Sequence, residues 1–161
     1  LSKSGYSLIA DDAKETLIST LMPLADVITP NIPEAEALSG VSITTIEDMK
    51  SAAYTISELT GAKVIVKGGY LNSEFAYDLV YDGMGFSVLE AEKIKTKNLH
   101  GAGCAFSSAI AAYMALGEDF KTACKSAKIY ITSAIEHGLD IGRGAESPNH
   151  FFHLYKKAEI S

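Results

Sequence analysis

A turn of small residues leads directly into a predicted helix, and its sequence is Gly101-Ala102-Gly103-Cys104. Apolar residues recur after it at helical spacing, from Phe106 to Tyr113, so the turn should open into a buried helix. Small residues let successive backbone N–H groups converge, and the positive end of the helix dipole favours an anion there. The stretch predicts a phosphate site whose field stabilises the thiolate form of Cys104. Alone, it also fits a plain turn before a core helix, with Cys104 as a small buried hydrophobe.

Polar residues also stand at the ends of two predicted strands. Asn31 and Glu34 follow one apolar run, and Lys67 ends another just before Gly69. Phosphoryl transfer between oxygens depends on charge neutralisation and alignment more than on covalent help. Lys67 has the charge and length to reach phosphate oxygens, and Glu34 has the carboxylate that binds Mg²⁺ directly or through water. Asn31 can orient that water or a phosphate.

Each of these residues also has a purely structural interpretation. Lys67 fits a solvated lysine at a strand end, and Glu34 fits the positive N-terminus of a helix. Asn31 fits an Asx-type turn before Pro33. His100, beside the glycine turn, fits either a phosphate contact or a structural role. Together the residues favour function, because three polar sets at corresponding ends of successive elements exceed what composition gives by chance.

The elements that must position these residues alternate between strands and helices. We predict strands over residues 25–29 and 63–67, and a hairpin of 74–81 and 86–94 across residues 82–85. Helices are predicted over 11–22, 33–39, 47–59 and 120–137, from the glycine turn to near Gly117, and from 148 onward. Leu21 and Leu59 are assigned to buried helix faces, and Cys124 to the core. This order indicates an α/β fold with a largely parallel sheet, which binds ligands at the carboxyl ends of its strands.

The totals limit the class of protein. The chain has 161 residues, of which 47% are hydrophobic and 21% charged, so we expect one globular domain over residues 1–161. The net charge of −6, without a cluster of basic residues, argues against nucleic acid or an anionic membrane as a partner. Two cysteines do not make a disulfide framework, which favours a reducing cytoplasm. We also expect a homodimer.

Several stretches resemble the ribokinase superfamily and, within it, the hydroxymethylpyrimidine/phosphomethylpyrimidine kinase family. They are residues 24–36 (LADVITPNIPEAE), 64–69 (VIVKGG), 98–110 (NLHGAGCAFSSAI) and 127–130 (AKIY). The tail at 142–150 (GRGAESPNH) is similar to the family's closing glycine, proline and histidine segment. The resemblance implies a ribokinase-like fold, a largely parallel sheet flanked by helices with one β-hairpin. It also implies that the N-terminal part of that fold is missing from this chain.

The resemblance further implies a kinase of thiamine synthesis that uses ATP and Mg²⁺. Its small-molecule substrates would be hydroxymethylpyrimidine, a pyrimidine alcohol, and then the monophosphate of that alcohol. Asn31 and Glu34 match an Asn-x-x-Glu motif that serves Mg²⁺ and phosphate, with Glu34 toward the metal. Lys67 and Gly69 match contacts to the ATP phosphates. The catalytic anion hole matches Gly101, Ala102, Gly103 and Cys104, whose thiol replaces the aspartate base of the superfamily's sugar kinases.

Three other functions remain open from the sequence. The first is the same reaction on pyridoxal or pyridoxine. The second is a nucleotide-binding module without turnover. The third is a thiol-redox protein that uses Cys104, which is the weakest because no resolving cysteine lies nearby in the sequence.

Overall fold

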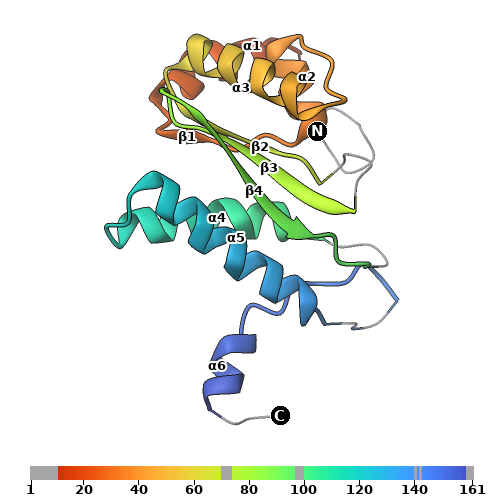
Figure 1. Cartoon of the computed structure of the whole chain (residues 1–161). Helices are drawn as coiled ribbons and strands as arrows, with labels where there is room; N and C mark the ends of the chain where they lie inside the picture. Colours follow the sequence, from red (N-terminus) through yellow and green to blue (C-terminus); the bar gives the residue numbers. More distant parts are fainter. Residues whose placement is uncertain (1–10, 70–73, 97–99, 140, 142, 159–161) are drawn as a thin grey trace. The chain divides into compact units, whose positions relative to one another are not determined.

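The computed structural model describes residues 11–69, 74–96, 100–139, 141 and 143–158. The chain separates into two compact units, Leu1–Glu90 and Ala91–Ser161, and each is described by itself (Figure 1). The single domain expected over residues 1–161 therefore stays a prediction.

The first unit contains a four-stranded sheet in the order β1-β2-β3-β4. The strands are β1 (Val27–Ile28), β2 (Lys63–Lys67), β3 (Phe75–Tyr81) and β4 (Phe86–Glu92). β1 and β2 are parallel, whereas β2 and β3 are antiparallel. β3 and β4 form the predicted hairpin, and in its turn the Asp82 carboxylate accepts hydrogen bonds from the N–H groups of Met84 and Gly85. The α/β class is confirmed, and the described sheet is mixed because the hairpin supplies half of its strands.

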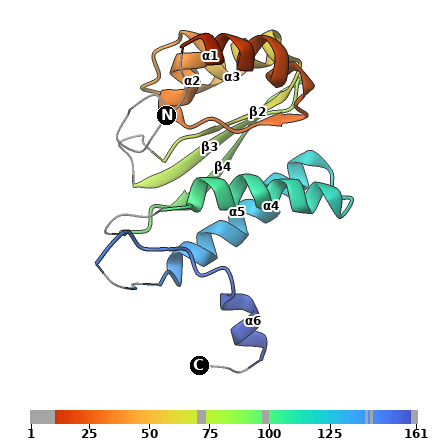
Figure 2. The same ribbon diagram turned by 180° about the vertical axis from the view of Figure 1, so that it is seen from behind.

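The helices of the first unit lie together on one face of this sheet, as both ribbon views show (Figures 1 and 2). They are α1 (Asp11–Thr16), the π-helical turn η1 (Leu17–Leu21), the 3₁₀ turn η2 (Met22–Leu24), α2 (Ile32–Ser39) and α3 (Ile46–Thr60). The single helix predicted over residues 11–22 is thus divided. Pro23, which has no N–H to continue an α-helical ladder, lies in the 3₁₀ turn. The strand predicted over residues 25–29 is shorter and keeps only Val27 and Ile28.

Helix α3 supplies most of the helical side of the core. Its buried face includes Met49, Ala52 and Ile56, which cluster with Val64 and Val66 of β2. Helix α3 extends one residue beyond the predicted range 47–59 at each end, between a capping box at Thr45 and a left-handed glycine, Gly61. The predicted burial of Leu59 is wrong, and so is that of Leu21, because both side chains are exposed. Helical periodicity marks the apolar face, but whether another element covers each position depends on the tertiary structure.

The second unit is helical. It contains α4 (Ala102–Ala115), α5 (Phe120–Glu136) and α6 (Phe152–Lys157), and α4 and α5 pack side by side (Figure 2). Cys124 is fully buried on α5, as predicted. The last helix begins at Phe152 rather than at Pro148, because the residues between them form a turn.

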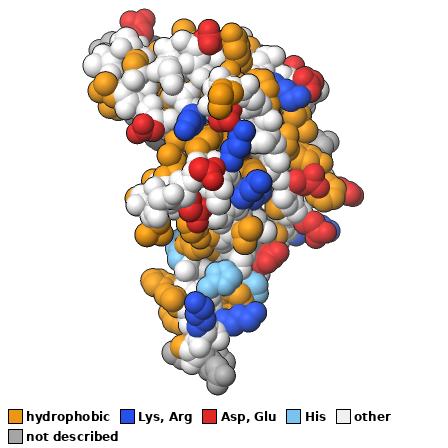
Figure 3. Space-filling view, turned by 60° about the vertical axis from the view of Figure 1, so that its left-hand side comes forward, with side chains coloured by type: hydrophobic (Ala, Val, Ile, Leu, Met, Phe, Trp, Pro, Cys, Tyr) orange, Lys and Arg blue, Asp and Glu red, His pale blue; other side chains and the backbone are white. Residues whose placement is uncertain are grey.

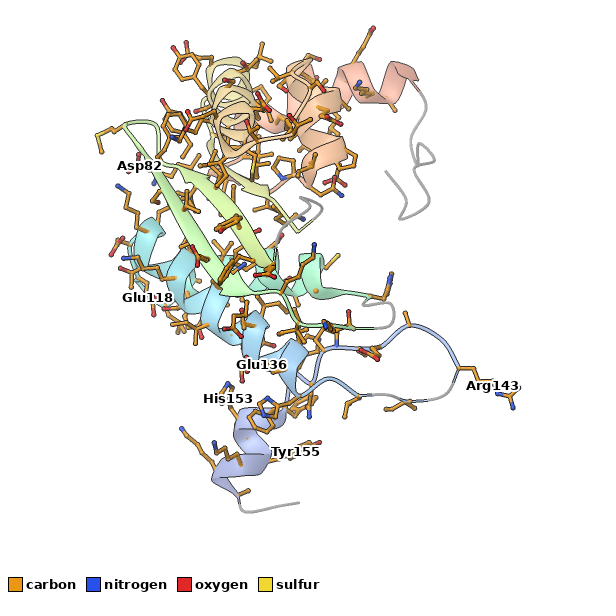
Figure 4. All side chains as sticks on the ribbon, turned by 45° about the vertical axis from the view of Figure 1, so that its right-hand side comes forward. Asp82, Glu118, Glu136, Arg143, His153 and Tyr155 are labelled. Atoms are coloured by element: carbon orange, nitrogen blue, oxygen red, sulfur yellow. The ribbon has the colours of Figure 1, made fainter. Side chains whose placement is uncertain are left out.

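The segment between α5 and α6 is attached to the end of α5. The N–H of Asn149 donates to the Ala134 carbonyl at 2.8 Å, and the His137 ring stacks on Phe152 with centroids 3.4 Å apart. The Lys156 ammonium lies 5.8 Å from the centre of the Phe152 ring. Figure 3 shows histidine and lysine side chains gathered over this C-terminal segment, and Figure 4 shows Arg143 at the tip of the preceding loop, pointing outward. No helix within the described ranges is long and apolar enough to cross a membrane.

Candidate functional site

The glycine turn begins helix α4 in an unusual way. Gly101 is its N-cap with φ 88° and ψ −12°, a left-handed conformation that glycine adopts without a steric penalty. Its carbonyl accepts the first helical hydrogen bond, from the N–H of Ala105 at 2.9 Å. Gly101 has no side chain that can bond to the first-turn N–H groups, which run from Ala102 to Cys104. These N–H groups are the donors that an anion would use.

A pocket of about 570 Å³ opens at this turn within the second unit. Its lining includes Gly101, Cys104, Ser108, Tyr113, Tyr130 and His150. The Cys104 side chain is exposed, in contrast to the buried Cys124. The alternative that Cys104 is a small core residue therefore does not hold within its own unit. The thiol is therefore accessible in the pocket, beside the backbone N–H groups that would bind an anion.

Tyr130 and His150 join two distant parts of the sequence at the wall of this pocket. The Tyr130 hydroxyl and His150 Nδ1 are 2.8 Å apart and hydrogen-bonded, and their rings stack with centroids separated by 6.2 Å. Burial raises the pKa of the Tyr130 hydroxyl, and the proximity of Tyr113 raises it further, so the hydroxyl stays neutral at physiological pH. Neither residue was predicted from the sequence to belong to the site. The available signal was that each residue ends a stretch resembling the kinase family.

The tail also holds the start of the glycine turn. The His100 N–H donates to the Glu146 carbonyl at 3.0 Å, and Leu139 forms an antiparallel bridge with Ser147. The main chain of His100 thus has a structural role, which was one of the two predicted alternatives. Asn98 and Leu99 of the same predicted stretch lie outside the described residues.

In the first unit, the carboxyl ends of β1 and β2 bring the other predicted residues together. Asn31 forms a parallel bridge with Lys67, and the Lys67 N–H donates to the Pro30 carbonyl at 2.8 Å. Glu34 lies in the first turn of α2, and Gly69 lies in an exposed turn two residues after Lys67. The predicted grouping of Asn31, Glu34 and Lys67 at one edge of the sheet is therefore present within this unit.

Asn31 and Glu34 form a complete capping box. The Asn31 side-chain carbonyl accepts the Glu34 N–H at 2.9 Å, and Glu34 Oε2 accepts the Asn31 N–H at 2.9 Å. Both residues thus have a structural role at the helix N-terminus, although the expected alternatives were an Asx-type turn for Asn31 and a charge facing the helix end for Glu34. Among the residues that the structure describes, no three His, Cys, Asp or Glu side chains cluster as a metal site. A single carboxylate still fits Mg²⁺, which commonly binds one or two protein carboxylates together with substrate phosphates and water.

The predicted site residues thus form two sets, each coherent within its own unit. Asn31, Glu34, Lys67 and Gly69 belong to the first unit, and the turn from Gly101 to Cys104 belongs to the second. That both sets act on one ligand remains a prediction from the sequence.

The family model and the relatives of known name point to the same protein family. The family model described as phosphomethylpyrimidine kinase matches residues 1–149. Hydroxymethylpyrimidine/phosphomethylpyrimidine kinase of Staphylococcus aureus is 42% identical over 98% of this chain and 58% of its own length. The thiamine biosynthesis bifunctional protein ThiED of Geobacter sulfurreducens is 42% identical over 93% of this chain and 31% of its own length.

A solved structure gives the corresponding fold. Bacillus subtilis pyridoxal kinase, crystallised as an ADP complex, superposes with a TM-score of 0.85 at 39% identity. The match covers 91% of this chain and 58% of the kinase. This chain therefore spans a little more than half the length of the Staphylococcus aureus and Bacillus subtilis kinases, and less than a third of the ThiED protein.

Proposed function

Because the chain belongs to the phosphomethylpyrimidine kinase family, we propose that it carries the ATP-side part of a pyrimidine kinase. The enzyme transfers phosphate from ATP to the hydroxymethyl group of a pyrimidine, and then phosphorylates the monophosphate, in thiamine synthesis. The observation that carries the proposal is the N-terminal turn of α4, where Gly101 is left-handed and Cys104 lines a pocket. The expected cytoplasmic location and homodimer are part of the same proposal.

The chemistry follows from this turn. The substrate oxygen forms a bond to the γ-phosphorus of ATP as the bond from that phosphorus to the β,γ-bridging oxygen breaks. The backbone N–H groups from Ala102 to Cys104 stabilise the negative charge on the transferring group. The Cys104 sulfur, as thiolate, accepts the proton that the hydroxyl loses. Its exposure in the pocket supports this role, because a proton acceptor must reach the substrate.

The first unit contributes charge neutralisation in this proposal. Lys67 and Gly69 bind ATP phosphates, and Asn31 and Glu34 would hold Mg²⁺, directly or through water, when the metal is bound. When bound, Mg²⁺ neutralises phosphate charge. Support comes from the bridge between Asn31 and Lys67, which brings these two residues and the first turn of α2 together at the carboxyl ends of β1 and β2.

A second candidate is pyridoxal kinase, since a structure of that enzyme superposes closely on this chain. The deciding assay measures ADP formed from ATP and Mg²⁺ with hydroxymethylpyrimidine, with its monophosphate and with pyridoxal. Turnover of the pyrimidines at the higher kcat/KM supports the proposal, and preference for pyridoxal supports the second candidate. ATP binding without ADP formation in any of the three reactions indicates a nucleotide-binding module.

Lys67 allows a direct test of the nucleotide site. Lys67→Ala should weaken ATP binding by about tenfold, because it removes a point charge from the phosphates. Lys63→Ala is the matched control, since Lys63 begins the same strand at its opposite end. Equal ATP dissociation constants for Lys67→Ala and the unsubstituted protein would leave Lys67 as a solvated strand-end lysine.

A further inference from the structure

Asp78 is a buried carboxylate in the middle of strand β3. Its exposed fraction is 7%, and the residues that follow it, Leu79 and Val80, belong to the apolar core. Burying a charged group is costly unless hydrogen bonds compensate for the lost water. An acidic side chain at this position therefore needs a specific partner.

One partner is the turn that follows β2. Asp78 Oδ1 accepts a hydrogen bond from the Gly68 N–H at 3.1 Å, and the same N–H donates to the Tyr77 carbonyl at 2.8 Å. The register of the antiparallel pair puts Asp78 directly opposite Lys67. A shared donor of this kind draws the backbone of Gly68 against β3.

The absence of a side chain at Gly68 makes this contact possible. A Cβ built there would overlap the Tyr77 carbonyl oxygen and lie 3.1 Å from Cε of Met49. Gly68 joins Lys67 to Gly69, so the contact fixes the backbone between these two residues. On the other side, the Lys67 N–H is held by the Pro30 carbonyl.

We propose that Asp78 is a positioning residue for the phosphate-binding edge of the sheet. Its carboxylate holds Gly68 and thereby fixes the direction in which Lys67 leaves β2 and in which the Gly69 backbone faces. The inference rests on the proposed function, in which Lys67 and Gly69 bind the phosphates of ATP. Asp78 itself does not touch the nucleotide.

The test compares three variants of the 161-residue chain for binding of ATP with Mg²⁺ and for thermal unfolding. Asp78→Ala removes the acceptor, and Asp78→Asn keeps an oxygen that can accept from Gly68. Thr60→Val is the control, because Thr60 is equally buried at 7% exposure and its hydroxyl bonds to the Ile56 carbonyl near the opposite end of β2. We expect the ATP dissociation constant to rise about tenfold or more in Asp78→Ala. We expect it to stay within about threefold in Asp78→Asn and Thr60→Val, although Thr60→Val also lowers the unfolding temperature.

Other results would overturn the inference in distinguishable ways. Unchanged ATP affinity in Asp78→Ala, or an equal loss in Thr60→Val, would leave Asp78 as an ordinary structural residue. Loss of affinity in Asp78→Asn as large as that in Asp78→Ala would exclude the hydrogen bond as the cause. Failure of the unsubstituted chain to bind ATP would contradict the proposed function and remove the basis of this inference with it. Amide exchange at Gly68 gives a second readout: it should be faster in Asp78→Ala and near the unsubstituted rate in Asp78→Asn.

Discussion

Helices α2 and α4 both begin at residues that were predicted to serve phosphate, yet their first turns differ. At α2, the Asn31 and Glu34 side chains bond to each other's backbone N–H groups. At α4, the N-cap is Gly101, which offers no side chain to the first turn. The same type of backbone donor is thus used for folding at one helix and left for water or a ligand at the other.

This difference shows how an anion site can be built at a small cost in stability. Replacing a good N-cap residue by glycine costs only a few tenths of a kcal/mol, whereas alanine costs about 1 kcal/mol. Helices α3 and α5 follow the pattern of α2, with caps from Thr45 and Asp119. Among these helices, α4 is the one whose N-terminal turn is suited to phosphate without first breaking a cap.

The largest effect should come from distorting the N-terminal turn of α4, which has no side-chain cap. Gly101→Val forces a β-branched residue into a left-handed conformation, which costs about 1–2 kcal/mol and displaces the first-turn amides. Because loss of one such donor typically costs 10²–10³ in rate, kcat should fall at least about 100-fold. Gly117→Val is the matched control, since Gly117 has φ 95° at the other end of α4. It should unfold at a similarly lowered temperature but keep kcat within about threefold. Equal losses of kcat in both variants would mean that strain alone, not the anion site, is responsible.

The next effect concerns the thiol at the same N-terminal turn. Cys104→Ala should lower kcat by about 10²-fold or more and leave the ATP dissociation constant nearly unchanged, because a proton acceptor acts in the transition state. Cys124→Ala is the control: it removes a buried sulfur, so it should reduce stability by about 1 kcal/mol without changing kcat. An unaltered pH–rate profile and kcat in Cys104→Ala would show that the thiol does not accept the proton.

A smaller effect is expected at α2, where a substitution of Glu34 can distinguish its role in the helix cap from a role in metal binding. Glu34→Gln keeps an oxygen that can accept the Asn31 N–H but removes the negative charge, so stability should change by less than about 0.5 kcal/mol. If Glu34 serves Mg²⁺, the Mg²⁺ concentration for half-maximal activity should rise several-fold. Asp48→Asn in the capping box of α3 is the control and should not change the Mg²⁺ requirement. A Mg²⁺ requirement that is equal in Glu34→Gln and Asp48→Asn would restrict Glu34 to capping.

The parts of this comparison that could be predicted from the sequence are the local ones. The limits of α2 and α3 follow from short-range chemistry: capping side chains at Asn31 and Thr45, and left-handed glycines at Gly40 and Gly61. The glycine turn was likewise predicted to open into a helix, because its residues are adjacent in the chain. The parallel ends of β1 and β2 then brought Asn31 beside Lys67 as expected.

The parts that were missed depend on residues that meet only in the folded chain. His150 reaches Tyr130 across 20 positions, and Asp78 reaches Gly68 across 10. No periodicity links the members of such pairs, so only a lone polar residue in an apolar run, as at Asp78, gives a hint. The exposure of Leu59 was missed for a related reason. Its spacing fits the apolar face of α3, but whether another element packs over that position depends on the tertiary structure.

The smallest effect is a pH dependence at a capped helix that has no proposed ligand. Hydrogen bonds from the Thr44 N–H and the Thr45 hydroxyl lower the pKa of Asp48 from 3.8 to about 2. Because the folded-state pKa lies below the unfolded value, the stabilisation by Asp48 is fully present above about pH 4 and is lost as the pH falls toward 2. The difference in urea midpoint between the unsubstituted protein and Asp48→Asn should therefore narrow between pH 5 and pH 2. The difference stays small because Asp48 is exposed to solvent, which screens its charge. A constant difference across this range would show that the carboxylate charge contributes nothing to the cap of α3, and that a capped helix differs from α4 in hydrogen bonding alone.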